Sequence, residues 1–341
     1  MFCIKRIVTL MLAVVTAVTS FMGISLPQND KKADSFRVKT WAVGEYIQDK
    51  SALHSEDFDI ITDVILFHCA TFDEEGKVDV EKEELTVALS NLREVIGDRD
   101  VKITLNLLGP GGHTDSEVWE DRMEAQSDAH NKAFKSGVLE DNIVAVLDEY
   151  KLDGVHFDYE YPLSLKAWRH FNKFLVSLDK KLGDYTLGVA AVEWNLKFSN
   201  AALKAVDSIE LMMYDVYDDE GKHATTETVK ELVKKVGLRA VPLEKVTLGL
   251  PFYARPSDRD SYWFGYNGYY TQIDENGWYH DEALNKDFWF NTPDVIYEKT
   301  DFAINEGYSG VMIWHYTCDL PAGDSASLTG AIGRAVNDNY Q

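Results

Sequence analysis

The stretch that decides the fold is Leu152–Pro162, LDGVHFDYEYP, where ionisable side chains interrupt a run that otherwise has the character of a buried strand. Side chains alternate between the two faces of a β-strand, so His156, Asp158 and Glu160 should point the same way. The apolar residues between them would pack against helices, which leaves the three polar groups inside the protein. Inward ionisable groups are costly unless they pair. A satisfied buried ion pair is the structural interpretation, and three such groups in succession favour a functional one.

Short apolar runs recur along the chain and alternate with amphipathic, helix-like stretches. The predicted strands are 38–47, 61–69, 101–108, 154–160, 185–192, 208–215, 246–253 and 310–316. The predicted helices are 79–96, 128–150, 164–182, 222–237, 293–306 and 325–337. This is the strand count of an α/β fold of the (β/α)8 TIM-barrel type, which carries its catalytic groups at the carboxyl ends of the strands. An open doubly wound sheet is the alternative, but no Gly-rich phosphate loop follows the first strand.

The N-terminus has the pattern of a secretory signal peptide. Lys5 and Arg6 precede an apolar run over 7–19, which is shorter than the roughly 20 residues of a membrane span. Two cleavage positions stay open, after Ser20 and after Gly23. We therefore expect a secreted, extracellular protein that has no membrane contact once the signal is removed. The predicted division is a signal peptide over 1–23, a flexible leader over 24–36 and a catalytic barrel over 37–341.

The net charge of −23 at pH 7 restricts the partners of the protein. Such a surface repels phosphate backbones, so nucleic acid is not an expected partner. The charge suits a soluble secreted protein that acts on a neutral or cationic substrate. A monomer is expected, and no cofactor or metal ion is predicted. Cys69 and Cys318 are too few for a disulfide scaffold. One bridge between them stays open, and two separate buried thiols are favoured.

The opening stretch resembles the signature of glycoside hydrolase family 18, the chitinases and endo-β-N-acetylglucosaminidases. The family pattern is Asp-Gly-x-Asp-x-Asp-x-Glu, commonly followed by Tyr-Pro, and His156 stands here where the family has its innermost aspartate. LMMYDVY contains the family's Met-x-Tyr-Asp element, TLGLPFYAR resembles its seventh strand, and GVMIWHYTCD resembles its eighth. The third strand matches less well, because Asn106 stands for a serine and Leu108 for a glycine. The resemblance spans roughly 38–320.

The resemblance implies hydrolysis assisted by the substrate, whose own 2-acetamido oxygen is the nucleophile. Glu160 would be the general acid and then the base, with a raised pKa. Asp158 would bond the acetamido N–H and stabilise positive charge. Tyr214 would donate to the acetamido oxygen, Asp215 would hold the distorted sugar, and Trp314 would stack under the ring. The other residues expected to bind substrate are Met212, Tyr161, Trp41 and His156.

His156 is the departure from the family pattern. Two neighbouring carboxylates cannot both ionise easily, so one of them holds a proton. A histidine cannot make that carboxylate–carboxylate pair, but it can still donate a hydrogen bond to Asp158. If protonated, it would favour ionised Asp158 and hold it away from Glu160. The prediction is an active enzyme with an altered pH profile.

The segment 254–309, between the last two predicted strands, is too short for a large α+β insertion once its helix is subtracted. It is dense in aromatic residues, which leaves two interpretations open. The rings form either a wall of sugar subsites or a hydrophobic minicore that folds the loop onto the barrel. The residues concerned are Trp263, Trp278, Trp289, Tyr262, Tyr266, Tyr269 and Tyr270.

Several functions compete within this frame. Chitin or chitooligosaccharides are the favoured substrates, because Tyr161-Pro162 and Trp314 follow the chitinase form. An endo-β-N-acetylglucosaminidase that acts on N-glycans is the runner-up. A catalytically silent chitin-binding barrel is a further alternative, although the presence of Glu160 argues against it. A metal-dependent hydrolase that uses the same polar groups is disfavoured, because the nearest further histidine, His68, is isolated.

Overall fold

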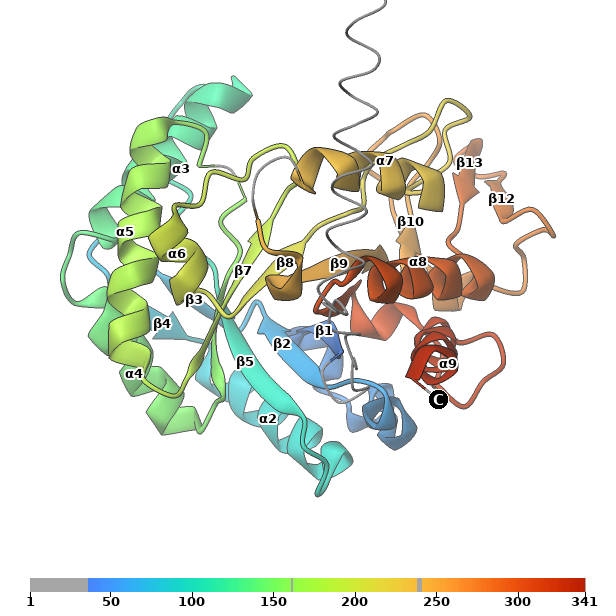
Figure 1. The fold of residues 1–341 in the computed structure, drawn as a ribbon, viewed down its shortest axis with the longest axis horizontal. Helices are drawn as coiled ribbons and strands as arrows, with labels where there is room; N and C mark the ends of the chain where they lie inside the picture. Colours follow the sequence, from blue (N-terminus) through green and yellow to red (C-terminus); the bar gives the residue numbers. More distant parts are fainter. Residues whose placement is uncertain (1–35, 161, 238–240, 341) are drawn as a thin grey trace, which may run out of the picture. The chain divides into compact units, whose positions relative to one another are not determined.

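The computed structural model describes residues 36–160, 162–237 and 241–340. The barrel strands are β1 (Arg37–Val43), β2 (Asp63–Phe67), β5 (Lys102–Leu107), β6 (Gly154–Phe157), β7 (Thr186–Ala191), β8 (Ser208–Leu211), β9 (Val246–Pro251) and β14 (Gly310–Trp314). They close into a parallel barrel in the order β1-β14-β9-β8-β7-β6-β5-β2 (Figure 1). The TIM barrel is confirmed, and each of the eight predicted strands contributes to it. Closure rules out the open doubly wound sheet.

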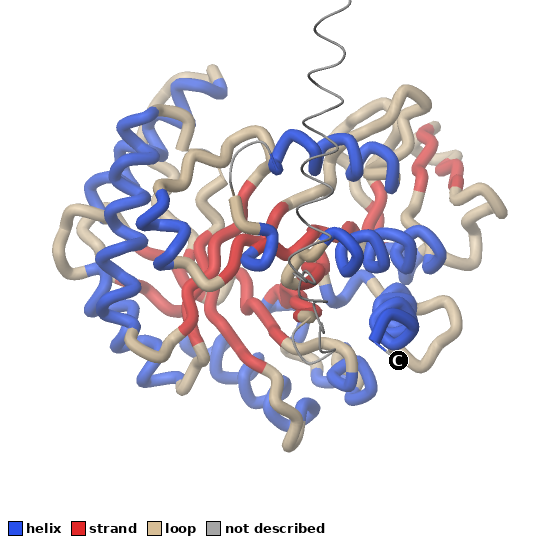
Figure 2. The backbone as a smooth tube through the Cα atoms, in the orientation of Figure 1, coloured by secondary structure: helices blue, strands red, loops and turns tan. Residues whose placement is uncertain are grey.

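Helices cover the outside of the strands (Figure 2). Gly137, with φ 76°, lies in the connection between α3 and α4, so the prediction of one helix over 128–150 was wrong. The helix predicted over 293–306 is found with the same bounds, while α6 was not predicted. The helices are α2 (Lys82–Ile96), α3 (Trp119–Ala133), α4 (Leu139–Tyr150), α5 (Leu165–Leu182), α6 (Asn200–Ala205), α7 (Thr226–Gly237), α8 (Pro293–Glu306) and α9 (Leu328–Tyr340).

The apolar face of β6 packs outward, as alternation predicts. The Phe157 ring lies 5.4 Å from that of Phe174 on α5, and the Tyr159 ring stacks at 4.1 Å on His130 of α3. Burying rings of this size stabilises the fold by roughly 2–3 kcal/mol each. This packing fixes the direction of the opposite face, which carries the ionisable groups toward the barrel interior.

All eight barrel strands end earlier than predicted, and in β6 and β8 the difference places the site. β6 stops at Phe157 and β8 at Leu211, although apolar residues continue in both sequences. Asp158 and Glu160 therefore lie just beyond the hydrogen-bonded ladder. Asp215 lies beyond β8 with a left-handed φ of 58°. The functional candidates are thus on the loops at the carboxyl ends of the strands, where a TIM barrel carries its active site.

The segment 254–309 contributes short strands rather than a large subdomain. The two-stranded sheets are β10 (Tyr253–Ala254) with β11 (Phe264–Gly265), β12 (Trp278–Asp281) with β13 (Lys286–Trp289) and, elsewhere, β3 (Ala70–Phe72) with β4 (Val78–Val80). Phe264 stacks on Tyr269 at 4.5 Å and contacts Phe288 at 4.6 Å, which favours the minicore interpretation for this part of the loop. Trp263 differs, because it is 42% exposed and its ring lies 5.9 Å from that of Tyr253.

Cys69 and Cys318 are buried free thiols. Burial is the main cause that raises the pKa of each to about 12, so both stay protonated at neutral pH. Residues 1–35, which hold the predicted signal peptide and nearly all of the leader, lie outside the described residues. Among the helices that are described, none is long and apolar enough to cross a membrane.

Candidate active site

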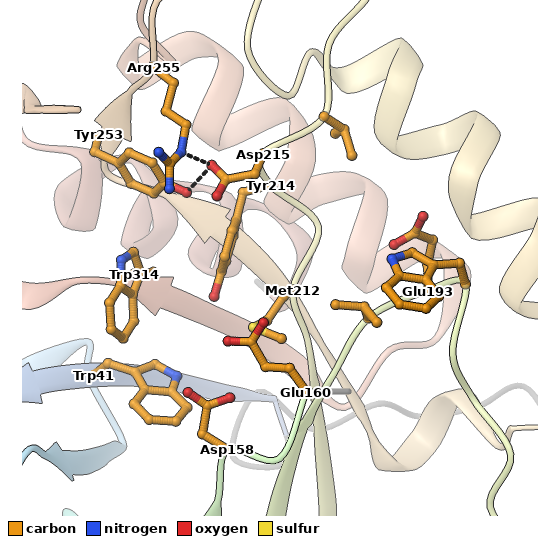
Figure 3. A pocket seen from close by; sticks show the side chains of 13 residues that line it. Trp41, Asp158, Glu160, Glu193, Met212, Tyr214, Asp215, Tyr253, Arg255 and Trp314 are labelled. Carbon is orange, nitrogen blue, oxygen red and sulfur yellow. Dashed lines mark hydrogen bonds and ion pairs between the residues drawn. The ribbon is translucent and has the colours of Figure 1, made fainter. Parts of the chain in front are cut away.

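A cavity of about 410 Å³ opens at the carboxyl ends of the barrel strands. It brings together seven of the predicted site residues, Trp41, Asp158, Glu160, Met212, Tyr214, Asp215 and Trp314 (Figure 3). Tyr161, the eighth, lies outside the described residues. His156, the ninth, lines a second cavity of about 310 Å³ formed mainly by the first halves of the strands. The structure therefore assembles most of the predicted set, and His156 lines a different cavity while its ring meets that of Trp41 edge-on at 4.8 Å.

Asp158 and Glu160 form the β6 wall of the cavity. The Oδ1 atom of Asp158 is buried and has no hydrogen-bond partner within the described residues. Burial, and then the charge of Glu160, raise the pKa of Asp158 to about 8. Asp158 therefore holds a proton at neutral pH. Because two adjacent carboxylates ionise together only at a high cost, they act as one unit with a single proton to place.

His156 pairs with another acid than the one expected. Its Nε2 lies 2.5 Å from Oε2 of Glu210, and its Nδ1 lies 3.5 Å from Nδ2 of Asn106. The expected hydrogen bond to Asp158 is replaced by these contacts, which occupy both ring nitrogens. The cause is Gly188 on β7, where a Cβ atom would lie only 2.4 Å from Cδ2 of His156. Without that atom the ring reaches across β7 to β8.

The charge of Glu210 is compensated below the pocket. Lys39 Nζ donates to Oε1 of Glu210 at 2.7 Å and to Oγ of Ser208 at 2.7 Å. Burial of Glu210 opposes its ionisation, but Lys39 and His156 outweigh burial and hold its pKa far below the usual range. The positive charge of Lys39 thus neutralises the negative charge of Glu210. His156 thus belongs to a buried network in the lower half of the barrel.

Asp215 forms the opposite wall of the cavity. Its Oδ1 accepts hydrogen bonds from the Tyr253 hydroxyl and the Arg255 Nε, both at 2.6 Å (Figure 3). Partial burial opposes ionisation, but the groups of His223, Arg255 and Tyr253 lower the pKa of Asp215 to about 2. Asp215 is therefore an anion over the whole neutral range, with its side chain 41% exposed at the cavity.

Sequence reasoning did not assign roles to Tyr253 and Arg255. Both belong to the stretch TLGLPFYAR, which was matched to a family strand as a whole. A polar pair directly after a buried strand was the available signal, since such positions lie at the open end of a barrel. Glu193 and Trp194, on the loop after β7, also line the cavity and were not predicted.

Tryptophan rings form the floor of the cavity. Trp41 of β1 is 2% exposed, and its ring meets that of Trp314 at 5.6 Å with an interplanar angle of 66°. The buried Nε1 of Trp41 has no hydrogen-bond partner among the described residues, so it offers a donor at this floor. Tyr214 points its hydroxyl toward the space between Trp314 and Glu160 (Figure 3). Flat apolar rings with a few polar tips suit the face and edge of a sugar.

A metal ion has no evident site in the described part of the chain. No group of three or more His, Cys, Asp and Glu side chains there is arranged to hold one. Of the polar groups considered as ligands, His156 is bound to Glu210, and Asp215 is bound to Arg255. The arrangement instead provides a protonated carboxyl group, an anion facing it and an aromatic floor, which are the elements of acid–base chemistry on a carbohydrate.

Comparison with known proteins gives consistent likenesses. Chitinase 1 of Aphanocladium album is 25% identical over 299 residues, covering 72% of this chain and 68% of that protein. A chitinase structure from Bacteroides thetaiotaomicron has a TM-score of 0.70 at 22% identity and covers 88% of this chain and 96% of its own. A mutant GH18 chitinase from Cycas revoluta, solved with (GlcNAc)4, has a TM-score of 0.67 at 13% identity and covers 89% and 100%.

The two structural likenesses, both below 25% identity, concern the fold. The family itself follows from the sequence, because the model of glycosyl hydrolases family 18 matches residues 29–319. That range contains all eight barrel strands and every residue of the cavity described above. The chain therefore belongs to glycosyl hydrolases family 18 and is a glycoside hydrolase.

Proposed function

We propose that the chain hydrolyses β-1,4 bonds of N-acetylglucosamine polymers, chitin or chitooligosaccharides, by substrate-assisted retaining catalysis with Glu160 as proton donor. The observation that carries this proposal is the placement of Asp158 and Glu160 on one wall of the cavity, opposite Asp215. The relatives named as chitinases support the substrate class, as does the related structure that holds (GlcNAc)4.

The single proton of the Asp158–Glu160 pair is the starting point of the mechanism. In the free enzyme, burial favours the proton on Asp158, whose pKa is about 8. When the acetamido N–H of the substrate donates to Asp158, it stabilises the ionised form of that carboxyl group. The proton then moves to Glu160, which is poised as the general acid. Substrate binding thereby protonates Glu160 just before it must donate that proton.

The chemical steps balance with these groups alone. Glu160 gives its proton to the glycosidic oxygen while the acetamido oxygen attacks the anomeric carbon, so the bond to the leaving group breaks and an oxazolinium ion forms. Asp158 stabilises the positive charge of that ion, and Tyr214 donates to the acetamido oxygen. Water then attacks the anomeric carbon, Glu160 takes its proton, and the acetamido group is restored. Two inversions at one carbon retain its configuration.

The test is turnover of a fluorogenic chitobioside by the purified protein. We expect Glu160→Gln to lower kcat by about 10²–10⁴-fold, the usual contribution of a positioned general acid. Glu149→Gln is the matched control, because Glu149 is an exposed residue of α4 that does not line the cavity. Wild-type protein that binds chitooligosaccharides without turning them over would instead identify a silent binding barrel.

Products from chitotetraose and from a high-mannose glycoprotein test the substrate class. We expect shorter N-acetylglucosamine oligomers from the first and no released glycan from the second. The opposite result would assign the protein as an endo-β-N-acetylglucosaminidase.

Secretion and a monomeric state are part of the same proposal. They are supported by the apolar run 7–19 behind Lys5 and Arg6, and by the net charge of −23. N-terminal sequencing of protein from culture medium should begin after Ser20 or Gly23. Size-exclusion chromatography with light scattering should give the mass of one chain.

A further inference from the structure

The backbone at Asp215 adopts a conformation that its side chain does not favour. Its φ is 58°, in the left-handed region that non-glycine residues rarely adopt. Such a conformation persists only when the surrounding structure enforces it. Tyr253 and Arg255 hold the carboxylate, but neither contacts the Asp215 backbone by a recorded hydrogen bond. Another group must therefore hold the main chain.

His223 contacts this backbone directly. The Asp215 N–H donates to Nε2 of His223 at 3.0 Å, and the His223 side chain is fully buried. The same Nε2 lies 3.2 Å from Oδ1 of Asp215, so His223 contacts both the main chain and the carboxylate of that residue. A backbone N–H always carries its proton, so Nε2 accepts from it when the proton of the neutral ring lies on Nδ1. Burial lowers the pKa of His223, which keeps the ring neutral and the Nε2 lone pair available.

The loop that carries His223 is in turn held by a buried lysine of α8. Lys299 is 0% exposed, and its Nζ donates to the carbonyl of Ala224 and to Oδ1 of Asn291. The Nδ2 of Asn291 then donates to the carbonyl of His223 at 3.0 Å. Three hydrogen bonds thus connect the loop to the Lys299 ammonium group, directly at Ala224 and through Asn291 at His223.

Lys299 has no carboxylate partner among the ion pairs of the described residues. A buried ammonium group whose hydrogen-bond acceptors are all neutral is expensive, and burial lowers the pKa of Lys299 to about 7. Packing alone would be served better by an apolar side chain of the same length. The arrangement is therefore explained by what the two hydrogen bonds hold in place.

We propose that His223 and Lys299 are positioning residues that fix the backbone of Asp215, so that its carboxylate faces the bound sugar. The chain of contacts runs from Lys299 through Asn291 to His223, and from His223 to Asp215. This inference rests on the proposed function for the role of Asp215 in turnover, and on geometry alone for the contacts. It links the outer helix α8 to one wall of the cavity.

Kinetics of matched variants test the proposal. His223→Phe keeps a ring but removes the acceptor, and misplacing Asp215 should lower kcat on chitooligosaccharides by roughly tenfold or more. KM should change by less than about threefold, because the interaction is required in the transition state. His223→Gln supplies an amide oxygen as acceptor and should recover much of the loss. Lys299→Met should lower kcat in the same direction as His223→Phe.

Thr300→Val is the control for destabilisation. Thr300 is a buried neighbour on α8 whose hydroxyl donates to the carbonyl of Ile296 at 2.8 Å, within the same helix. Its substitution should lower Tm without lowering kcat. If folded His223→Phe and Lys299→Met variants also lose only Tm and keep the wild-type kcat, the proposal is overturned.

The tautomer of His223 gives a test that needs neither turnover nor a variant. Long-range ¹⁵N–¹H spectra of the wild-type protein should show a neutral ring with its proton on Nδ1. A proton on Nε2, or a doubly protonated ring at neutral pH, would overturn the proposal. A wild-type protein without chitooligosaccharide turnover would instead sink the proposed function, and the spectra would still decide whether His223 accepts from Asp215.

Discussion

Asp158, just beyond β6, and Glu210, within β8, are both acids of the barrel interior, but their environments act on their protons in opposite directions. Glu210 has Lys39 and His156 within hydrogen-bond distance and stays ionised despite its burial. Asp158 has a buried Oδ1 without a partner and a second carboxyl group nearby, and its pKa rises to about 8. Partners, more than depth, therefore decide the charge of an acid in this barrel.

The difference separates the structural half of the interior from the functional half. Below the pocket Lys39 neutralises the buried charge of Glu210, as a stable core requires. At the pocket the two carboxyl groups of the Asp158–Glu160 pair share one proton. An acid in this condition can exchange that proton with a substrate. Asp215 is an intermediate case, since it lines the pocket but has Arg255 as its cation.

Asp158→Asn should break this comparison with the largest effect. The amide cannot ionise, so it cannot accept the acetamido N–H as an anion or stabilise the oxazolinium charge. We expect kcat to fall by about 10²–10³-fold, the cost of losing one well-placed electrostatic contact in a transition state. The measurement is kcat on a fluorogenic chitobioside from pH 4 to pH 9.

The same variant has a stability signature whose sign follows from the pKa. Burial and the charge of Glu160 raise the pKa of Asp158 from its usual 3.8 to about 8 on folding, so folding favours binding of a proton between these values. The stabilising contribution of this group is complete below its unfolded pKa and is lost as pH rises toward 8. The Tm of Asp158→Asn relative to wild type should therefore increase from pH 4 to pH 8 and then level off. A difference in Tm that stays constant with pH would contradict the raised pKa.

Arg255→Met extends the comparison to Asp215, because it removes the cation that is paired with this acid of the pocket. Without it, burial of Asp215 is opposed by fewer groups and the pKa of Asp215 rises from about 2. The acid limb of the kcat profile should move to higher pH, with a loss of roughly tenfold at neutral pH, comparable to one charged hydrogen bond.

Arg259→Met is the matched control for that variant. Arg259 lies over the Tyr217 ring at 5.3 Å, on the same loop as Arg255, and does not contact Asp215 by a recorded ion pair. Its removal changes the net charge equally and should leave the acid limb in place. Equal shifts in both variants would mean that the general field, and not the contact, sets the pKa of Asp215.

The fold was predictable because its determinants are local. Each barrel strand is a short apolar run, and α8 begins with Pro293 and is followed by Gly307, with φ 87°, which are start and stop signals readable in the sequence. The strand ends were predicted too long, because apolar residues continue past Phe157 and Leu211 into the loops. Only the hydrogen-bond ladder, which depends on the neighbouring strand, shows where each strand stops.

The site was predictable in its residues but not in its pairings. Alternation in one strand was enough to place Asp158 and Glu160 on one wall. The partner of His156 is Glu210, 54 residues away in the sequence, and the contact depends on the gap left by Gly188. That gap has meaning only once His156 is known to lie opposite Gly188 in the register of β6 and β7. Long-range register is the information that a single sequence lacks.

His156→Leu should have the smallest effect on activity and is the most direct test of the separation between the two halves. Removing the ring leaves Oε2 of Glu210 buried without this partner, which should destabilise the fold by about 1–3 kcal/mol. Because His156 shares no hydrogen bond with Asp158 and reaches the cavity only through the edge contact of its ring with Trp41, kcat should change by less than about threefold and its pH profile should not move. A double-mutant cycle with Asp158→Asn measures the coupling: the two changes in unfolding free energy should add to within about 0.5 kcal/mol. A larger coupling, or a shifted pH profile in His156→Leu, would mean that His156 acts on the Asp158–Glu160 pair. It would contradict the assignment of His156 to the structural network around Glu210.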